Sequence, residues 1–136
     1  MQILTLDMLS LNTDRHFNNL GLIVDASTGV YKAVPIFDNG NSLLSDWDRF
    51  DEETVEENLE KVYGQPFSAS LEMQAREAGI GLMIDYEKLQ TVLEKEPVSR
   101  GVKVLKYQLK RYHNIIPDYK MQQENELEQD APELKL

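Results

Sequence analysis

The chain has 136 residues and a mass of 15.7 kDa, which suits one domain of ordinary size and is too short for two comfortable cores. Its 24 acidic and 14 basic residues give a formal net charge of -10, so non-specific binding to DNA or to an anionic membrane is not expected. The absence of cysteine excludes disulfides, thiolate zinc sites, iron–sulfur clusters and cysteine nucleophiles.

The N-terminal residues do not resemble a signal peptide, because they carry no basic segment and meet an acid at Asp7. No apolar run approaches the roughly 20 residues that a membrane span needs. We therefore expect a soluble, cytoplasmic protein.

The first part of the chain predicts a buried helix followed by a β-hairpin. Residues 2 to 11 are apolar on most sides, which is typical of a short, well-buried helix. Two β-rich runs, over residues 20 to 25 and 30 to 35, flank a four-residue turn that ends in Gly29, and this pattern favours a hairpin. Pro35 is expected to end the second strand, because it has no N–H to give to a ladder.

The middle of the chain predicts two short helices and leaves one segment ambiguous. Residues 46 to 60 contain eight acids and one arginine, and the end of this segment is expected to form a helix with an acidic, solvated face. Residues 67 to 78 do not favour one assignment. Asp85 has the chemistry of an N-cap for a helix over residues 86 to 95, whose inward side chains are expected to be Leu89, Val92 and Leu93.

The last predicted helix runs from a cap at Ser99 to about His113. It carries an apolar stripe and a basic stripe, formed respectively by Val102, Leu105, Leu109 and Tyr112 and by Arg100, Lys103, Lys106 and Lys110. Residues 118 to 136 hold six acids and almost no aromatic residues. We therefore divide the chain into a domain over residues 1–116 and an acidic, disordered or loosely docked tail over residues 117–136.

Three polar residues have the order that metal-assisted phosphoryl transfer uses. Asn19 follows Asp14 by five positions, and Asp38 opens an Asp-Asn-Gly turn after the predicted hairpin. In kinases a catalytic-loop Asp comes first, an Asn five residues later holds one Mg²⁺, and an Asp of an Asp-x-Gly turn holds another. Carboxylate and amide oxygens suit the hard Mg²⁺ ion, although Asp38-Asn39-Gly40 alone would also fit a simple tight turn.

The residues around these three carry a family resemblance. The stretch LNTDRHFNNLG at residues 11–21, followed by AVPIFDNGNSL at residues 33–43, resembles the C-terminal lobe of HipA-like serine/threonine kinases. It is also similar to the wider group with an Asp-Arg-His catalytic loop, which includes phosphatidylinositol 3/4-kinases. The resemblance covers about residues 8 to 44. It implies a mainly α-helical α+β fold like a kinase C-lobe, with one β-hairpin carrying the metal-binding loop, and transfer of phosphate from Mg-ATP to a protein Ser/Thr.

The resemblance also assigns roles to individual residues. Asp14 corresponds to the catalytic base, and His16 is expected near the phosphates as a second catalytic residue. Asn19 and Asp38 correspond to the Mg²⁺ ligands and so to the cofactor-binding residues. Asn18 is adjacent to the ligand position, but the five-residue spacing favours Asn19.

One part of the family pattern is missing. Such kinases have an upstream lobe with a phosphate-covering loop and a lysine that contacts the nucleotide phosphates. Only 13 residues precede Asp14, no lysine occurs before Lys32, and the glycines of residues 79–81 follow the motif and lack a Walker-type lysine. We therefore expect a truncated or single-lobe kinase, which binds Mg²⁺ and ATP only if an N-lobe partner or a missing upstream segment is supplied.

Two other functions stay open on the sequence alone. A degenerate kinase lobe could act as a non-catalytic binding module that holds a protein partner through its acidic face or its tail. A lipid-head-group kinase fragment would rest only on the Asp-Arg-His element, and no basic or amphipathic membrane patch lies near it. Neither nucleic acid nor a membrane is an expected partner.

Several surface features have both a simple and a functional interpretation. The acidic segment of residues 46–60 fits a solvated helix face or a docking site for a basic peptide substrate. Trp47 fits a partly exposed core cap or a substrate-facing aromatic residue. The basic stripe either balances the acids or forms a patch for an anion or an acidic partner, and His113 is expected to be structural or exposed.

Overall fold

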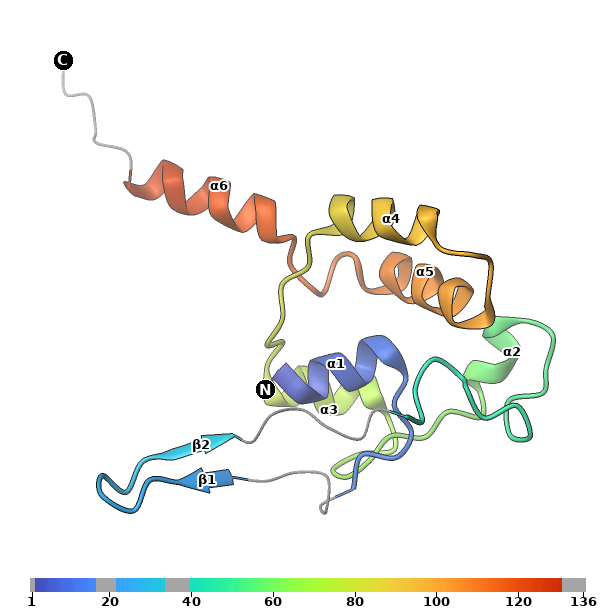
Figure 1. Cartoon of the computed structure of the whole chain (residues 1–136), viewed down its shortest axis with the longest axis horizontal. Coiled ribbons are helices and arrows are strands. Elements are labelled where there is room, and N and C mark those ends of the chain that lie inside the picture. Colours follow the sequence, from blue (N-terminus) through green and yellow to red (C-terminus); the bar gives the residue numbers. More distant parts are fainter. Residues whose placement is uncertain (1, 17–21, 34–39, 131–136) are drawn as a thin grey trace.

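The computed structural model describes residues 2–16, 22–33 and 40–130 of the chain, and this part is mainly α-helical (Figure 1). Its six helices are α1 (Gln2–Ser10), α2 (Val55–Leu59), α3 (Leu71–Ala78), α4 (Tyr86–Lys95), α5 (Arg100–Tyr112) and α6 (Tyr119–Asp130). Two short strands, β1 (Leu22–Val24) and β2 (Tyr31–Ala33), lie within the two β-rich runs of the sequence. The mainly helical class is confirmed, whereas the predicted metal-binding loop with Asp38 lies outside the described residues.

The two strands pair antiparallel, with Ile23 opposite Lys32 in the middle of the register. The turn between them is closed by the N–H of Gly29, which donates to the carbonyl oxygen of Asp25 over 2.8 Å. Gly29 has a φ of +70°, a conformation in which a side chain would be strained. Hydrogen bonds from Ser27 lower the pKa of the Asp25 carboxyl below its usual value. In Figure 1 this hairpin extends away from the helices.

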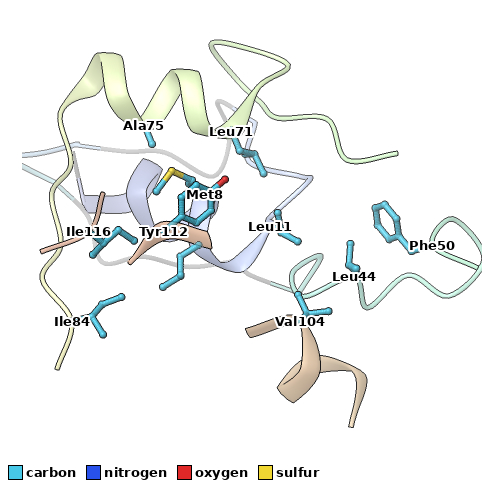
Figure 2. Close-up of a cluster of buried hydrophobic side chains, with 11 residues drawn as sticks. Met8, Leu11, Leu44, Phe50, Leu71, Ala75, Ile84, Val104, Tyr112 and Ile116 are labelled. Atoms are coloured by element: carbon cyan, nitrogen blue, oxygen red, sulfur yellow. The ribbon is translucent and has the colours of Figure 1, made fainter. Parts of the chain in front are cut away.

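The core surrounds α1. This helix packs against α3 and α5, while α4 and α2 each pack against α5. Because α1 is apolar on most sides, it can be covered by more than one neighbour, and Leu4 and Met8 are almost completely buried. Figure 2 shows the cluster that results, which joins residues from both ends of the chain: Met8, Leu9, Leu11, Leu44, Phe50, Leu71, Ala75, Ile84, Val104, Tyr112 and Ile116.

Both predicted helix caps are confirmed. The Asp85 carboxylate accepts a hydrogen bond from the N–H of Lys88 over 3.1 Å, and the Ser99 hydroxyl accepts one from the N–H of Val102 over 3.2 Å. The inward position predicted for Val92 is wrong, because its side chain is 47% exposed. The reason is that α4 packs against α5 along one side, where Leu93 is buried, so a wide apolar face is not needed.

The buried face of α5 differs from the predicted apolar stripe. Its fully covered residues are Val104, Gln108 and Tyr112, whereas Val102, Leu105 and Leu109 are only partly buried. The centre of this face is a glutamine, whose side-chain Nε2 donates to the carbonyl oxygens of Met8 and Leu9 over 3.0 and 3.3 Å. Tyr112 of the predicted stripe is buried as expected, whereas the buried Gln108 was not part of that stripe.

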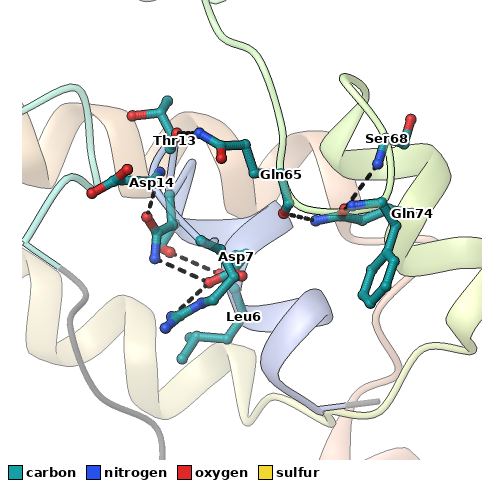
Figure 3. Close-up of polar contacts among 11 residues, drawn as sticks. Leu6, Asp7, Thr13, Asp14, Gln65, Ser68 and Gln74 are labelled. Atoms are coloured by element: carbon teal, nitrogen blue, oxygen red, sulfur yellow. Dashed lines mark hydrogen bonds and ion pairs between the residues drawn. The ribbon is translucent and has the colours of Figure 1, made fainter. Parts of the chain in front are cut away.

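The ambiguous segment of residues 67–78 contains α3, which begins at an N-cap. The hydroxyl of Ser70 accepts a hydrogen bond from the N–H of Met73 over 3.1 Å. Gln74 is buried beside it, where its amide donates to the carbonyl oxygen of Gln65 over 2.7 Å and accepts from the N–H of Phe67 over 3.2 Å (Figure 3). This glutamine fixes the preceding loop against α3.

Within the segment predicted as a disordered or loosely docked tail, residues Tyr119–Asp130 form helix α6. The composition suggested disorder because the segment has little to bury, but Glu, Gln, Met and Leu have good helix propensity. The carboxylate of Asp118 also accepts a hydrogen bond from the N–H of Lys120 over 2.8 Å and starts the helix. The side chains of residues 119–128 are nevertheless all exposed.

Among the residues that the structure describes, no helix combines the length and the apolar character that a membrane crossing would require.

Candidate functional site

The candidate catalytic loop begins where α1 ends. Leu11 has a φ of 55°, in the left-handed region that is unfavourable for a non-glycine residue. This conformation turns the chain so that the N–H of Asn12 donates back to the carbonyl oxygen of Asp7 over 3.0 Å. The side chain of Leu11 is only 3% exposed, so its burial in the core offsets the backbone strain.

A buried ion pair then holds the loop. The Arg15 guanidinium donates through Nε and Nη2 to the two carboxylate oxygens of Asp7, each over 3.0 Å, and both side chains are fully buried. Asn12 joins them, because its Nδ2 donates to Asp7 over 3.2 Å and its Oδ1 accepts from the N–H of Asp14 over 3.0 Å. Figure 3 shows this chain of contacts from α1 to the backbone of Asp14.

The sequence did not identify Asp7 as part of the site. Its position in an otherwise apolar helix could have indicated this role. A buried carboxylate requires a partner, and Arg15 lies eight residues further on.

The loop meets the segment that follows the Asp-Asn-Gly motif of the sequence. The N–H of Thr13 donates to the carbonyl oxygen of Asn41 over 3.1 Å, and the N–H of Leu43 donates to that of Ser10 over 2.7 Å. The side-chain Nδ2 of Asn41 also donates to Oδ2 of Asp14 over 3.2 Å. The proposed base and the end of the second motif are therefore in direct contact.

The second segment is itself strained at this point. Leu43 and Leu44 have φ values of 55° and 56°, and Leu44 is 1% exposed. Left-handed non-glycine residues gather at functional sites when the surrounding structure can hold them. Here they occur on both of the segments that meet around Asp14.

The predicted site residues divide into two groups. Asp14 and His16 lie in the described loop and are both partly buried. Within the described residues, Nδ1 of His16 is inaccessible to water and has no hydrogen-bond partner. The predicted Mg²⁺ ligands Asn19 and Asp38 lie outside the described residues, as does Asn18.

Two requirements of a complete kinase site can be compared with the described part of the chain. No group of three or more Asp, Glu or His side chains that could hold a metal ion occurs among the described residues. Asn19 and Asp38, the Mg²⁺ ligands expected from the sequence, lie outside these residues, and their oxygen donors are of a kind that suits that ion. The Asp14 carboxylate is oriented by Asn41 and can accept a proton from a hydroxyl group.

Two of the grooves on the described surface are large enough to note, and neither is lined by Asp14 or His16. One, of about 610 Å³, lies between α4 and α5, and the other, of about 360 Å³, lies among α2, α3 and the end of α5.

The acidic segment of residues 46–60 is mostly exposed, as predicted. Trp47 is 67% exposed, and the guanidinium of Arg100 lies 4.1 Å from the centre of its ring. An aromatic side chain that covers the edge of the core would be less exposed than Trp47 is. Arg100 also donates through Nη2 to the carbonyl oxygen of Phe50, so it connects this segment to the start of α5.

Comparisons with models of known protein families, with curated proteins and with solved structures find no match for this chain.

Proposed function

We propose that this chain is the metal-and-base lobe of a HipA-like serine/threonine protein kinase. Its phosphoryl donor is Mg-ATP, and a nucleotide-binding N-lobe is supplied by a partner or by an upstream segment. The observation that carries the proposal is the 3.2 Å contact between Asn41 and Asp14, because it joins the catalytic-loop motif to the segment directly after the Asp-Asn-Gly motif. The antiparallel pairing of β1 with β2 already brings the flanking segments together, and the contact supports the proposal because it places the candidate base beside the second motif.

In this mechanism Asp14 takes the proton of the acceptor hydroxyl as the phosphoryl group is transferred. Asn41 orients one carboxylate oxygen, and Asn12 fixes the backbone at Asp14, so the base is held in place before the substrate arrives. A bound Mg²⁺ would supply neutralisation of the phosphate charge. Asn19 and Asp38 are the residues proposed to hold it.

The test combines binding and transfer measurements on the full chain. Titration calorimetry with Mg-ATP is performed on the chain alone and after mixing with the product encoded directly upstream. We expect binding and transfer of the γ-phosphate to a protein substrate only in the mixture. Absence of Mg-ATP binding in both samples would exclude the enzymatic function.

A matched pair of variants tests the role of the base. Asp14→Asn keeps the shape of the side chain and an acceptor oxygen, so we expect the melting temperature to stay within about 2 °C and transfer to fall at least about 100-fold. Asp48→Asn, at an exposed position, changes the charge equally and is expected to keep full transfer. Equal activity of the two variants would show that Asp14 is not the base.

A non-catalytic binding module is the second candidate, and the exposed Trp47 within an acidic segment favours it. Aromatic residues are common anchors of protein interfaces. If the mixture fails to bind Mg-ATP but the chain still retains the upstream-encoded product on a column, and Trp47→Ala abolishes this retention, the binding function is supported instead.

A further inference from the structure

Helix α6 leaves the body of the molecule with its side chains uncovered. Its first turn is fixed, because the N–H of Tyr119 donates to the carbonyl oxygen of Ile84 over 2.9 Å and Nζ of Lys120 lies 2.7 Å from the carboxylate of Glu87. Beyond this turn, the side chains of residues 121–128 are all exposed, and Figure 1 shows the helix running away from α4 and α5. Isolated helices of about 12 residues are marginal in water, so α6 would gain from packing against another surface.

One side of α6 combines apolar and acidic residues. Met121, Glu124, Leu127 and Glu128 follow one another at spacings of three, three and one, which places them on the same side of the helix. Met121 and Leu127 are 63% and 72% exposed. This side therefore offers two large apolar side chains together with two carboxylates one helical turn apart.

The groove between α4 and α5 has complementary chemistry. It has a volume of about 610 Å³, with Tyr86, Leu93 and Leu109 as apolar lining residues. Lys106 and Lys110, both exposed, line it from α5. These two cations outnumber the one carboxylate in the lining, that of Glu94.

The spacing of the charges also agrees. Lys106 and Lys110 are four residues apart on α5, as Glu124 and Glu128 are on α6, so both pairs are separated by about 6 Å along their helices. The groove in question belongs to another molecule, because the fixed first turn directs α6 away from the groove of its own chain.

We propose that two copies of this chain associate by placing α6 of each copy in the α4–α5 groove of the other. Such an exchange is closed and two-fold symmetric, since the same pair of surfaces meets twice. The contacts are the apolar side chains of Met121 and Leu127 with the groove, and the ion pairs of Glu124 and Glu128 with Lys106 and Lys110. This association is independent of the proposed kinase activity.

Sedimentation equilibrium of the full chain measures the association directly. We expect a dimer whose dissociation constant increases between about 50 mM and 500 mM NaCl, because salt screens exposed ion pairs. A chain that remains monomeric at about 1 mM protein in low salt would exclude the proposal, since it would leave an affinity weaker than about 1 mM.

Charge reversals locate the contact. We expect Lys106→Glu with Lys110→Glu to increase the dissociation constant at least about 10-fold, and Glu124→Lys with Glu128→Lys to do the same, because each replaces attraction by repulsion in both halves of the dimer. The control is Lys88→Glu with Lys95→Glu, which changes the net charge equally at exposed positions of α4 outside the groove. Circular dichroism confirms that each variant is folded.

Mixing the two reversed variants gives the decisive result. One variant then presents an acidic groove to a basic α6, and the other presents a basic groove to an acidic α6, so both contacts are restored in a heterodimer. We expect the dissociation constant of the mixture to return to within about threefold of the unmodified chain. If the mixture stays as weak as the separate variants, or if the control weakens the dimer equally, the proposed contact is wrong.

Discussion

Two ion pairs of this molecule have similar geometry and very different surroundings. Arg15 and Asp7 are separated by 3.0 Å, and both side chains are fully buried. Lys61 and Asp51 are even closer, at 2.6 Å, but their side chains are 34% and 67% exposed. We expect the shorter contact to contribute less to the free energy of unfolding, because water and salt can replace either partner of an exposed pair.

The difference also concerns what each pair holds in place. The buried pair connects α1 to the loop of Asp14 through Asn12. The exposed pair connects the acidic segment to Lys61, the residue directly after it, which also contacts Glu52 over 3.1 Å. A buried charge cannot be left without its partner, whereas an exposed one can. Three predictions test this comparison, in order of decreasing effect on the stability of the fold.

The largest effect is expected from Asp7→Ala. It removes the carboxylate that accepts two hydrogen bonds from the buried Arg15 guanidinium, and it also removes an acceptor from Asn12. We expect the free energy of unfolding, measured by urea denaturation, to fall by about 3–5 kcal/mol.

Two further variants serve as controls for Asp7→Ala. Asp48→Ala, at an exposed position, should change the free energy of unfolding by less than about 0.5 kcal/mol. Asp7→Leu combined with Arg15→Met removes both charges and should recover most of the stability. A loss below about 1 kcal/mol for Asp7→Ala would mean that the contact of Asp7 with Arg15 contributes little to the free energy of unfolding.

An intermediate loss of stability is expected from Gln108→Met. Leaving a buried neutral polar group without a partner costs less free energy than leaving a buried charge without one. The substitution preserves volume but removes the donor to the carbonyl oxygens of Met8 and Leu9 at the end of α1. We expect a loss of about 1–2 kcal/mol in the free energy of unfolding by thermal or urea denaturation. The matched change Gln122→Met, on exposed α6, should have no comparable effect, and an equally stable Gln108→Met would show that water replaces the lost donor.

The smallest effect is expected from the exposed pair, and it depends on pH. The hydrogen bond from Lys61 lowers the pKa of the Asp51 carboxyl. A carboxyl whose pKa is lower in the folded state stabilises that state above its unfolded pKa of about 4, and this contribution disappears as the pH falls through the folded pKa.

The measurement compares Lys61→Met with the unmodified chain between about pH 2 and pH 6. We expect the variant to be slightly less stable at the upper end of this range and the difference to close towards pH 2. A difference that grows on acidification would have the wrong sign for this pair. Lys95→Met, at an exposed position outside the pair, serves as the control.

The sequence predicted most of the helices because local signals determine them. Asp85 and Ser99 are N-caps that hydrogen-bond within three residues, and the apolar composition of residues 2–11 is enough to indicate a buried helix. These features depend on neighbours along the chain. They need no knowledge of which segments meet in space.

The polar side chains of the core could not be predicted in the same way. Gln108 is buried because it pairs with carbonyl groups about 100 residues earlier, and Gln74 because it pairs with a loop that comes before α3. A glutamine in a helical pattern normally indicates the solvated face. The hydrogen bond between Asp14 and Asn41 was likewise beyond the sequence, since it depends on how the segments on either side of the hairpin meet.

The contact between Gln108 and the end of α1 has a consequence for how the protein is made. The carbonyl oxygens of Met8 and Leu9 have their Gln108 donor only after α5 has left the ribosome, and Gly81 must also be present to donate to the hydroxyl of Thr5. At about 5–20 residues per second, roughly 100 residues of synthesis take about 5–20 seconds. For that interval the apolar N-terminal segment lacks α5, and for most of it α3 as well, so the nascent chain passes through a stage at which chaperones or self-aggregation compete with folding.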